Sequence, residues 1–269
     1  MTLISTPQLI LAIIGILVIS FMFSIFGRGG GEFKLPLLLS MVALPFGELK
    51  TISVFLILVQ GVIMLLIYSK KHHLMDWPFA ILLAGFVAIS SFFGAYFSHT
   101  VQPFYLKGLF VLVLLVSALK MAMGVKQSAQ RGRFGVWERP GLSGHDAYFV
   151  NLIYLLPPLV AIAFIAGMLG VSGCGLIIPL TIIVGGLPIR IAIGSNTLLL
   201  ITSTGASFSG HLMRHTFHYK LALILAAATA VGAYFGSRQH TDISEQNIKR
   251  GFITILLIAA LWMAVKMFW

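Results

Sequence analysis

The chain has 269 residues, of which 59% are hydrophobic and only 9% are charged. A soluble domain carries roughly a quarter of its residues as Asp, Glu, Lys or Arg, so this composition excludes a water-soluble fold and predicts an all-α polytopic membrane protein. The net charge is +11, but the cations gather in short loops beside apolar runs, which indicates membrane topology and not nucleic-acid binding. A single cysteine, Cys174, excludes an intramolecular disulfide and a zinc site built on thiolates.

Apolar runs between Gly, Pro and charged residues predict the membrane-spanning helices. Each predicted span is long enough to cross about 30 Å of hydrocarbon. Two further apolar pieces, 33–44 and 176–187, reach only about half that distance, so we expect re-entrant or broken half-helices there. The eight predicted spans are 8–26, 51–69, 77–98, 103–123, 150–169, 190–210, 219–236 and 247–268.

The two halves of the chain resemble each other at an offset of about 143 residues. Gly27 then aligns with Gly170, and Gly30 with Gly173. Each half would hold four spans and one half-helix, an even number of crossings that favours parallel repeats, whereas the repeats become inverted if the short pieces span. The predicted units are a first transmembrane repeat, a basic linker and a second transmembrane repeat, over 1–123, 124–148 and 149–269.

Positive charge predicts the orientation of the spans. Basic residues end one helix at Lys70, fill the linker and mark a third loop at Arg214. With eight spans these three loops fall on one side of the membrane, and an excess of Lys and Arg marks the cytoplasmic side. We therefore expect the linker and both termini in the cytoplasm.

Two glycine motifs, 27–31 and 170–175, each precede a half-helix. Glycine permits positive φ and close backbone approach, and it leaves N–H groups free to point into a cavity at the positive end of a helix. Inside a membrane, unpaired backbone is tolerated only where it is buried in protein or lines a filled space. Because bare N–H groups and a helix dipole favour an anion, we expect an anion site there. Close helix packing is the alternative role for these glycines.

These motifs resemble those of the TauE/SafE sulfite exporter family, and the similarity covers nearly the whole chain. The resemblance implies a transporter of sulfite, sulfoacetate or a related organosulfur anion in the bacterial inner membrane, with no cofactor. Five side chains depart from the family pattern and leave the substrate open: Arg28, Glu32, Lys34, Ser172 and Cys174. The segments that carry the resemblance are Gly27-Arg28-Gly29-Gly30-Gly31 with its following Pro36, the run from Gly170 to Pro179, Gly186-Leu187-Pro188 and Ala192-Ile193-Gly194-Ser195-Asn196.

Polar residues near the motifs supply the candidate site. Arg28 offers charge and a planar fork to an oxyanion, with snorkelling to headgroups as its alternative role. Glu32 and Glu48 are candidates for exchanging a coupling proton, unless each only neutralises a neighbouring lysine. Ser53 and Gln60 are assigned to helix packing. The predicted substrate-binding residues are Arg28, Gly29, Gly30, Gly31, Ser172, Gly173, Gly175, Ser195 and Asn196.

Other classes of function are weighed against a carrier. A passive anion channel shares the same site chemistry, but two breaker motifs near mid-membrane favour alternating access. Gly170-Val171-Ser172-Gly173 also reads as a motif of intramembrane serine proteases, yet Gly29 takes the serine's place in the first copy. His211 and His215 lack an acidic or thiol partner nearby, so no metal site is predicted. We expect a non-enzymatic transporter whose partners are a small anion and membrane lipid, and a homodimer stays open.

Overall fold

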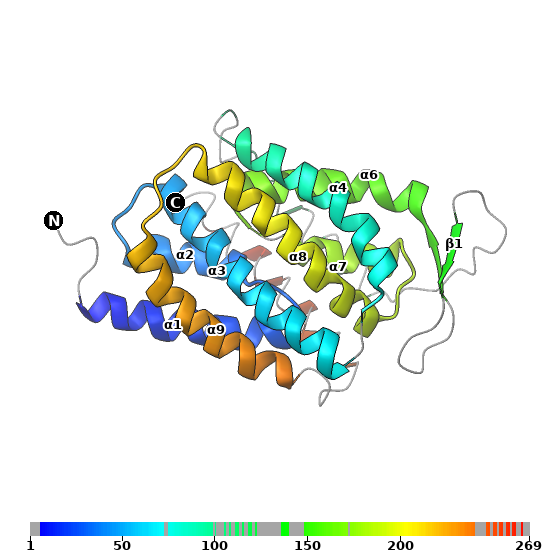
Figure 1. Ribbon diagram of the computed structural model, residues 1–269, viewed down its shortest axis with the longest axis horizontal. Helices are drawn as coiled ribbons and strands as arrows, with labels where there is room; N and C mark the ends of the chain where they lie inside the picture. Colours follow the sequence, from blue (N-terminus) through cyan, green and yellow to red (C-terminus); the bar gives the residue numbers. More distant parts are fainter. Residues whose placement is uncertain are drawn as a thin grey trace.

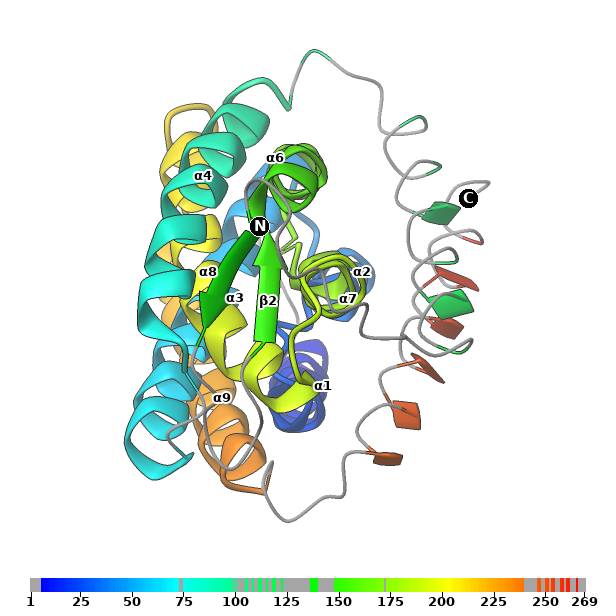
Figure 2. The same cartoon turned by 90° about the vertical axis from the view of Figure 1, so that its right-hand side faces the viewer.

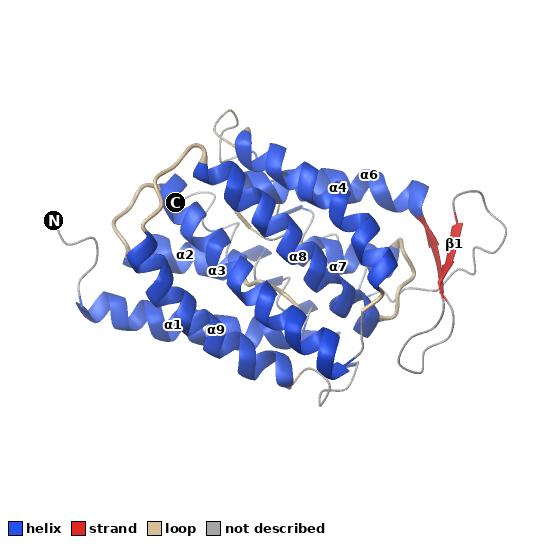
Figure 3. Ribbon diagram, in the orientation of Figure 1, coloured by secondary structure: helices blue, strands red, loops and turns tan. Residues whose placement is uncertain are grey.

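The computed structural model describes residues 6–72, 75–98, 100, 136–139, 148–171 and 173–239, with scattered positions between 105 and 122 and between 246 and 265. Helices dominate these described residues, and their only strands form one short ribbon (Figure 3). The helices are α1 (Thr6–Ile25), α2 (Gly31–Met41), α3 (Phe46–Ile67), its π-helical continuation η1 (Tyr68–His72), α4 (Trp77–Tyr96), α6 (Leu152–Leu169), α7 (Cys174–Ile183), α8 (Ile189–Leu212) and α9 (Tyr219–Arg238).

Six of these helices are long and apolar enough to cross a membrane, namely α1, α3 with η1, α4, α6, α8 and α9. They coincide with six of the predicted spans, so the prediction of an all-α polytopic membrane protein is confirmed. The predicted spans 103–123 and 247–268 lie largely outside the described residues. α2 and α7 have 11 and 10 residues, about 15 Å of helix each, which is half a membrane, as expected for the two short pieces.

The two strands mark one end of the molecule. β1 (Val136–Arg139) and β2 (Tyr148–Asn151) pair antiparallel. Figure 1 shows them at the opposite extremity from the connection between α8 and α9. We call these extremities the ribbon end and the connection end. The ribbon is a small departure from the all-α prediction: β1 lies in the predicted linker, whereas β2 begins at the last linker residue and continues into the predicted second repeat.

α1 and α2 form a helical hairpin: α1 begins at the connection end of the molecule, and α2 runs back to the same end. The Tyr68 hydroxyl donates to the Ser24 carbonyl at 2.5 Å, so α1 reaches almost to the far end of α3 before α2 returns. α6 and α7 form the corresponding hairpin from the ribbon end. α6 follows β2 directly, and Gly170 after it lies against Lys50, near the start of α3.

These hairpins correct the predicted topology. Gly47, at the start of α3, lies against His215 beside the α8–α9 connection. Lys70 in η1 is therefore at the ribbon end and Arg214 at the connection end. The prediction that these two basic loops lie on the same side is wrong. The reason is that α7 returns the chain to the ribbon end before α8 begins. The prediction counted α6 as a full crossing and did not count this return, so it placed the later loops on the wrong side.

The starts of α2 and α7 meet at mid-depth. In Figure 2, α3, α4, α8 and α9 lie on one side of the helices α1, α2, α6 and α7. Gly31 lies against Ile57, in the middle of α3, and a Cβ on Gly31 would be 3.4 Å from the Cα of Val171. The two glycine motifs, far apart in the sequence, are thus neighbours in the fold.

Candidate functional site

The first and fourth residues of the two glycine motifs share a left-handed backbone conformation. Gly27 and Gly30 both have φ of 67°, and Gly170 and Gly173 have φ of 72° and 63°. This left-handed region is open to glycine and strained for most other residues. Gly30 and Gly173 are the N-caps of α2 and α7, and neither helix receives a hydrogen bond from a capping side chain. Two helix N-termini therefore present first-turn N–H groups and the positive end of the dipole at mid-depth.

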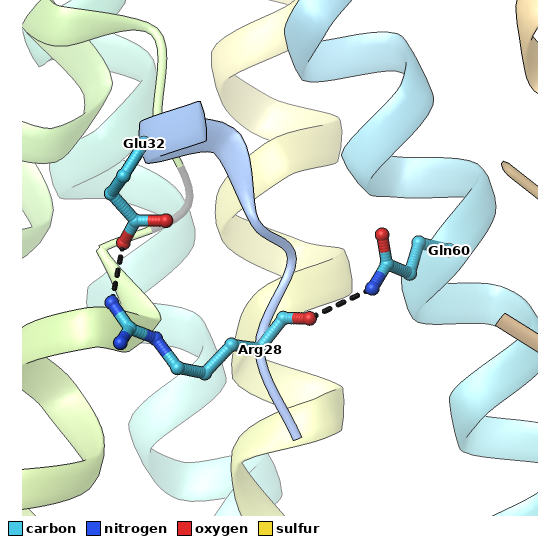
Figure 4. Close-up of polar contacts among 3 residues, drawn as sticks. All are labelled: Arg28, Glu32 and Gln60. Atoms are coloured by element: carbon cyan, nitrogen blue, oxygen red, sulfur yellow. Dashed lines mark hydrogen bonds and ion pairs between the residues drawn. The ribbon is translucent and has the colours of Figure 1, made fainter. Parts of the chain in front are cut away.

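Arg28 reaches from the first motif to the second half-helix. Its Nη2 donates to Glu32 Oε1 at 2.8 Å, and both side chains are buried (Figure 4). A Cβ on Gly175, in the first turn of α7, would collide with Arg28 Nη2 and lie 2.6 Å from Glu32 Oε1. The missing side chain of Gly175 thus makes the space for this ion pair.

Gln60 on α3 ties the first motif in place. Its Nε2 donates to the Arg28 carbonyl at 2.9 Å, drawn in Figure 4, and to Ser24 Oγ at 2.8 Å. Its Oε1 accepts a hydrogen bond from the Lys34 ammonium. The sequence analysis assigned Gln60 to helix packing. An amide within the apolar second half of this helix was the available signal that it could instead hold a polar loop.

Buried charge around the motifs is unbalanced in the described part of the chain. Arg28, Lys34 and Lys50 are buried basic side chains, and Glu32 is the buried acidic side chain among them. Among the described residues, Lys50 donates hydrogen bonds to neutral oxygens, Ser98 Oγ and the Met168 carbonyl, each at 3.4 Å. Buried charges are costly unless they are paired, so this arrangement favours a bound anion.

The remaining buried carboxylate is apart from the motifs. Asp76, before α4, accepts a hydrogen bond from the Tyr148 hydroxyl of β2 and caps α4 through Phe79 N. Its own N–H donates to Ser195 Oγ at 3.0 Å. Ser195, predicted to bind substrate, is thus engaged in joining α8 to α4.

Asn196 differs from its neighbour Ser195. Its side chain is buried, and within the described part of the chain neither Nδ2 nor Oδ1 has a hydrogen-bond partner. Ile193, three residues before it, lies against Gly27 of the first motif. Residues three apart share a helix face, so Asn196 lies on the side of α8 that faces this motif.

The two candidate coupling carboxylates lie in different places. Glu32 is at the start of α2 with Oε1 on Arg28, and its Oε2 is buried without a hydrogen-bond partner. Glu48 is at the connection end, where Oε2 is 2.9 Å from His218 Nε2 in a partly exposed pair. The structure therefore brings Glu32, and not Glu48, to the meeting point of the motifs. Gly29 is buried within the first motif, and Ser172 lies outside the described residues.

No group of three or more His, Cys, Asp or Glu side chains within the described residues is placed to hold a metal ion. The donor set at the motifs is instead made of backbone N–H groups, a guanidinium, ammonium groups and an amide. These groups suit an anion with several oxygen atoms.

Comparison with protein families finds one match that covers almost the whole chain. The model of the family described as Sulfite exporter TauE/SafE matches residues 11–263. No curated protein and no solved structure matches the chain.

Proposed function

Because the chain belongs to the sulfite exporter TauE/SafE family, we propose that it is a secondary transporter that carries a small sulfur oxyanion, such as sulfite or sulfoacetate, across the bacterial inner membrane. The family and the six apolar helices make the chain a multi-pass membrane protein of a transporter family. Membership of that family agrees with the expectation of a non-enzymatic function.

The observation that carries the proposal is the meeting of the two half-helix starts beside excess buried positive charge. α2 and α7 begin at mid-depth without side-chain caps, and Arg28 lies there against Gly175. Helix N-termini bind oxyanions through their N–H groups and dipole, and a guanidinium pairs with two oxygens at once. A sulfur oxyanion supplies both the charge and the oxygen atoms for such a site.

The two halves, we infer, are inverted repeats. Gly27 of the first motif lies against Ile193 of α8, and Gly170 of the second motif lies against Lys50 of α3. Both contacts join the first glycine of one motif to the same position on the other half's helix, at the offset of about 143 residues. The contacts are therefore reciprocal, as a two-fold relation between the halves requires.

A second pair of contacts repeats this reciprocity. Gly94 of α4 lies against the backbone of Phe164 in α6, and Gly236 of α9 lies against the backbone of Phe21 in α1. α1 begins at the connection end and α6 at the ribbon end (Figure 1). Parallel repeats would begin at the same end, so this difference favours inverted repeats over the parallel ones that the sequence suggested.

Inverted repeats around a mid-depth site support transport by alternating access. We keep the linker on the cytoplasmic side, because its sequence is rich in Lys and Arg. The connection end, where α1 begins, is then periplasmic. This assignment replaces the cytoplasmic N-terminus expected from the sequence.

Glu32 is the proposed coupling group. Its carboxylate forms an ion pair with the Arg28 guanidinium, to which an incoming anion would also bind. A proton on Glu32 removes the negative charge that competes for Arg28, so proton uptake and anion binding would assist each other. Glu48, at the connection end, pairs with His218 and not with Arg28.

Transport by purified protein in liposomes tests the proposal. We expect sulfite or sulfoacetate to cross faster than sulfate or acetate, and an imposed pH gradient to change the rate. A carrier also exchanges labelled anion faster when unlabelled anion is present on the opposite side, whereas a channel does not. Protein-free liposomes are the control. The proposal fails if no sulfur oxyanion crosses above that control.

A further inference from the structure

Two buried polar side chains at equivalent positions in the halves have no hydrogen-bond partner among the residues that the structure describes. Ser53 on α3 and Asn196 on α8 are 0% and 1% exposed. Ser53 Oγ and both polar atoms of the Asn196 amide are unsatisfied. Nearly all buried polar groups in folded proteins are satisfied, so two such groups at matching positions call for an explanation.

Ser53 lies on the face of α3 that contacts both motifs. The side chain of Lys50, three residues before Ser53, lies against Gly170 of the second motif. Ile57, four residues after it, lies against Gly31 of the first motif. Residues at these spacings form one stripe of a helix, so Ser53 sits between the two contacts and on the side of the second motif.

Asn196 occupies the same position on α8. Ile193, three residues before it, lies against Gly27, and Leu200, four residues after it, packs with Ile57 of α3. Asn196 therefore faces the first motif, as Ser53 faces the second. Each glycine motif is opposed by one neutral polar side chain from the other half of the chain.

We propose that Ser53 and Asn196 are a matched pair of anion-binding residues, which donate hydrogen bonds to the transported oxyanion from opposite sides of the two glycine motifs. This inference rests on the proposed function and adds Ser53, which the sequence analysis assigned to helix packing, to the site. Ser195 differs from this pair, because its Oγ accepts a hydrogen bond from Asp76 N and so joins α8 to the start of α4.

Neutral donors have a specific use in a carrier. Arg28 and the lysines attract any anion, whereas the Ser53 hydroxyl and the Asn196 amide need an oxygen acceptor at a defined position. They therefore select an anion with several oxygens over a halide. They also add no permanent charge that would hold the anion and slow its release.

Binding and stability measurements on two variants test the proposal. In Ser53→Ala and Asn196→Leu, the affinity for sulfite, measured by titration calorimetry on the purified protein, should fall by about ten- to a hundredfold. Without anion, thermal unfolding should occur at an unchanged or higher temperature, because each change removes an unsatisfied buried group.

Matched controls come from buried residues whose hydroxyls bond within their own helix. Ser90 Oγ donates to the Phe86 carbonyl at 2.7 Å, and Thr197 Oγ1 donates to the Gly194 carbonyl at 2.6 Å. Ser90→Ala and Thr197→Val should leave sulfite affinity within about twofold of the wild type.

Three outcomes overturn the proposal in different ways. If the wild type binds sulfite and either variant binds it equally well, that residue is not an anion ligand and the matched pair is wrong. If the variants keep affinity but unfold at lower temperature, these side chains serve packing. If the wild type binds none of sulfite, sulfoacetate and sulfate, the proposed function fails, and the inference fails with it.

Discussion

Arg28 and Glu32 form a buried ion pair. Glu32 is 6% exposed and Arg28 is fully buried. Removing one partner of a buried pair leaves the other charge uncompensated, which costs about 3–5 kcal/mol. Variants at Arg28 therefore have to separate effects on folding from effects on anion binding.

Replacing Arg28 with lysine should weaken sulfite binding about ten- to a hundredfold, because lysine keeps the charge but loses the planar fork. Arg28→Ala should lose binding and also stability, since Glu32 is left buried and unpaired. Titration calorimetry and thermal unfolding in detergent measure the two effects.

A double variant separates charge pairing from binding at this position. Arg28→Met combined with Glu32→Gln removes both charges, so it should recover most of the stability lost in Arg28→Ala while still failing to bind sulfite. Wild-type affinity for sulfite in Arg28→Lys would instead show that the planar guanidinium is not needed to bind the anion.

Gly175 can be tested by the addition of a single methyl group. A Cβ there would collide with Arg28 Nη2, so Gly175→Ala should displace the ion pair, lower transport and destabilise the protein by about 1–3 kcal/mol. Gly85 on α4 is the matched control, because a Cβ there meets nothing within 4 Å. Gly85→Ala should keep transport and add about 0.5–1 kcal/mol of stability. Equal behaviour of the two variants would show that the space at Gly175 has no role.

At the scale of elements, the half-helices depend on their left-handed caps. Gly30→Val and Gly173→Val should abolish transport while the protein still inserts, because valine cannot adopt φ near 65° without strain. Gly30→Asn should retain more transport than Gly30→Val, since asparagine enters this region more readily. Flux in liposomes and the amount of protein in the membrane fraction are the measurements. Wild-type flux in both valine variants would contradict the role assigned to the caps.

A polar cluster at the ribbon end joins the strand ribbon to the helices. The Tyr148 hydroxyl donates to Asp76, whose N–H donates to Ser195. Tyr148→Phe should therefore lower stability by about 1–3 kcal/mol through the acceptor left without its donor, with sulfite affinity unchanged. A loss of affinity without a loss of stability would place this cluster in the binding site instead.

At the scale of the whole molecule, the two hairpins set which loops share a side of the membrane. In a Cys174→Ala background, Glu138→Cys on β1 and Met213→Cys beside the α8–α9 connection place one thiol at each end. A membrane-impermeant thiol reagent should label Met213→Cys in intact spheroplasts and Glu138→Cys only after lysis. Labelling of both in intact spheroplasts would overturn the inverted arrangement.

The sequence by itself determined the class of the molecule, the six described spans, the two half-helices and the family. These features depend on the length of apolar runs and on Gly and Pro as breakers, which act within a few residues of themselves. The positive φ at Gly30 and Gly173 belongs to the same local information, because glycine alone adopts it freely.

The tertiary structure decided what depends on contacts between distant residues. The meeting of Arg28 with Gly175 joins two motifs that are separated along most of the chain, and hydropathy carries no information about such a contact. The return of α7 to the ribbon end reverses the side of every later loop, although α7 has the same composition as a helix that crosses. Ser53 Oγ and the Asn196 amide meet no hydrogen-bond partner among the described residues, whereas Ser195 Oγ accepts from Asp76 N. That difference depends on how α3, α4 and α8 pack, which residue types alone do not specify.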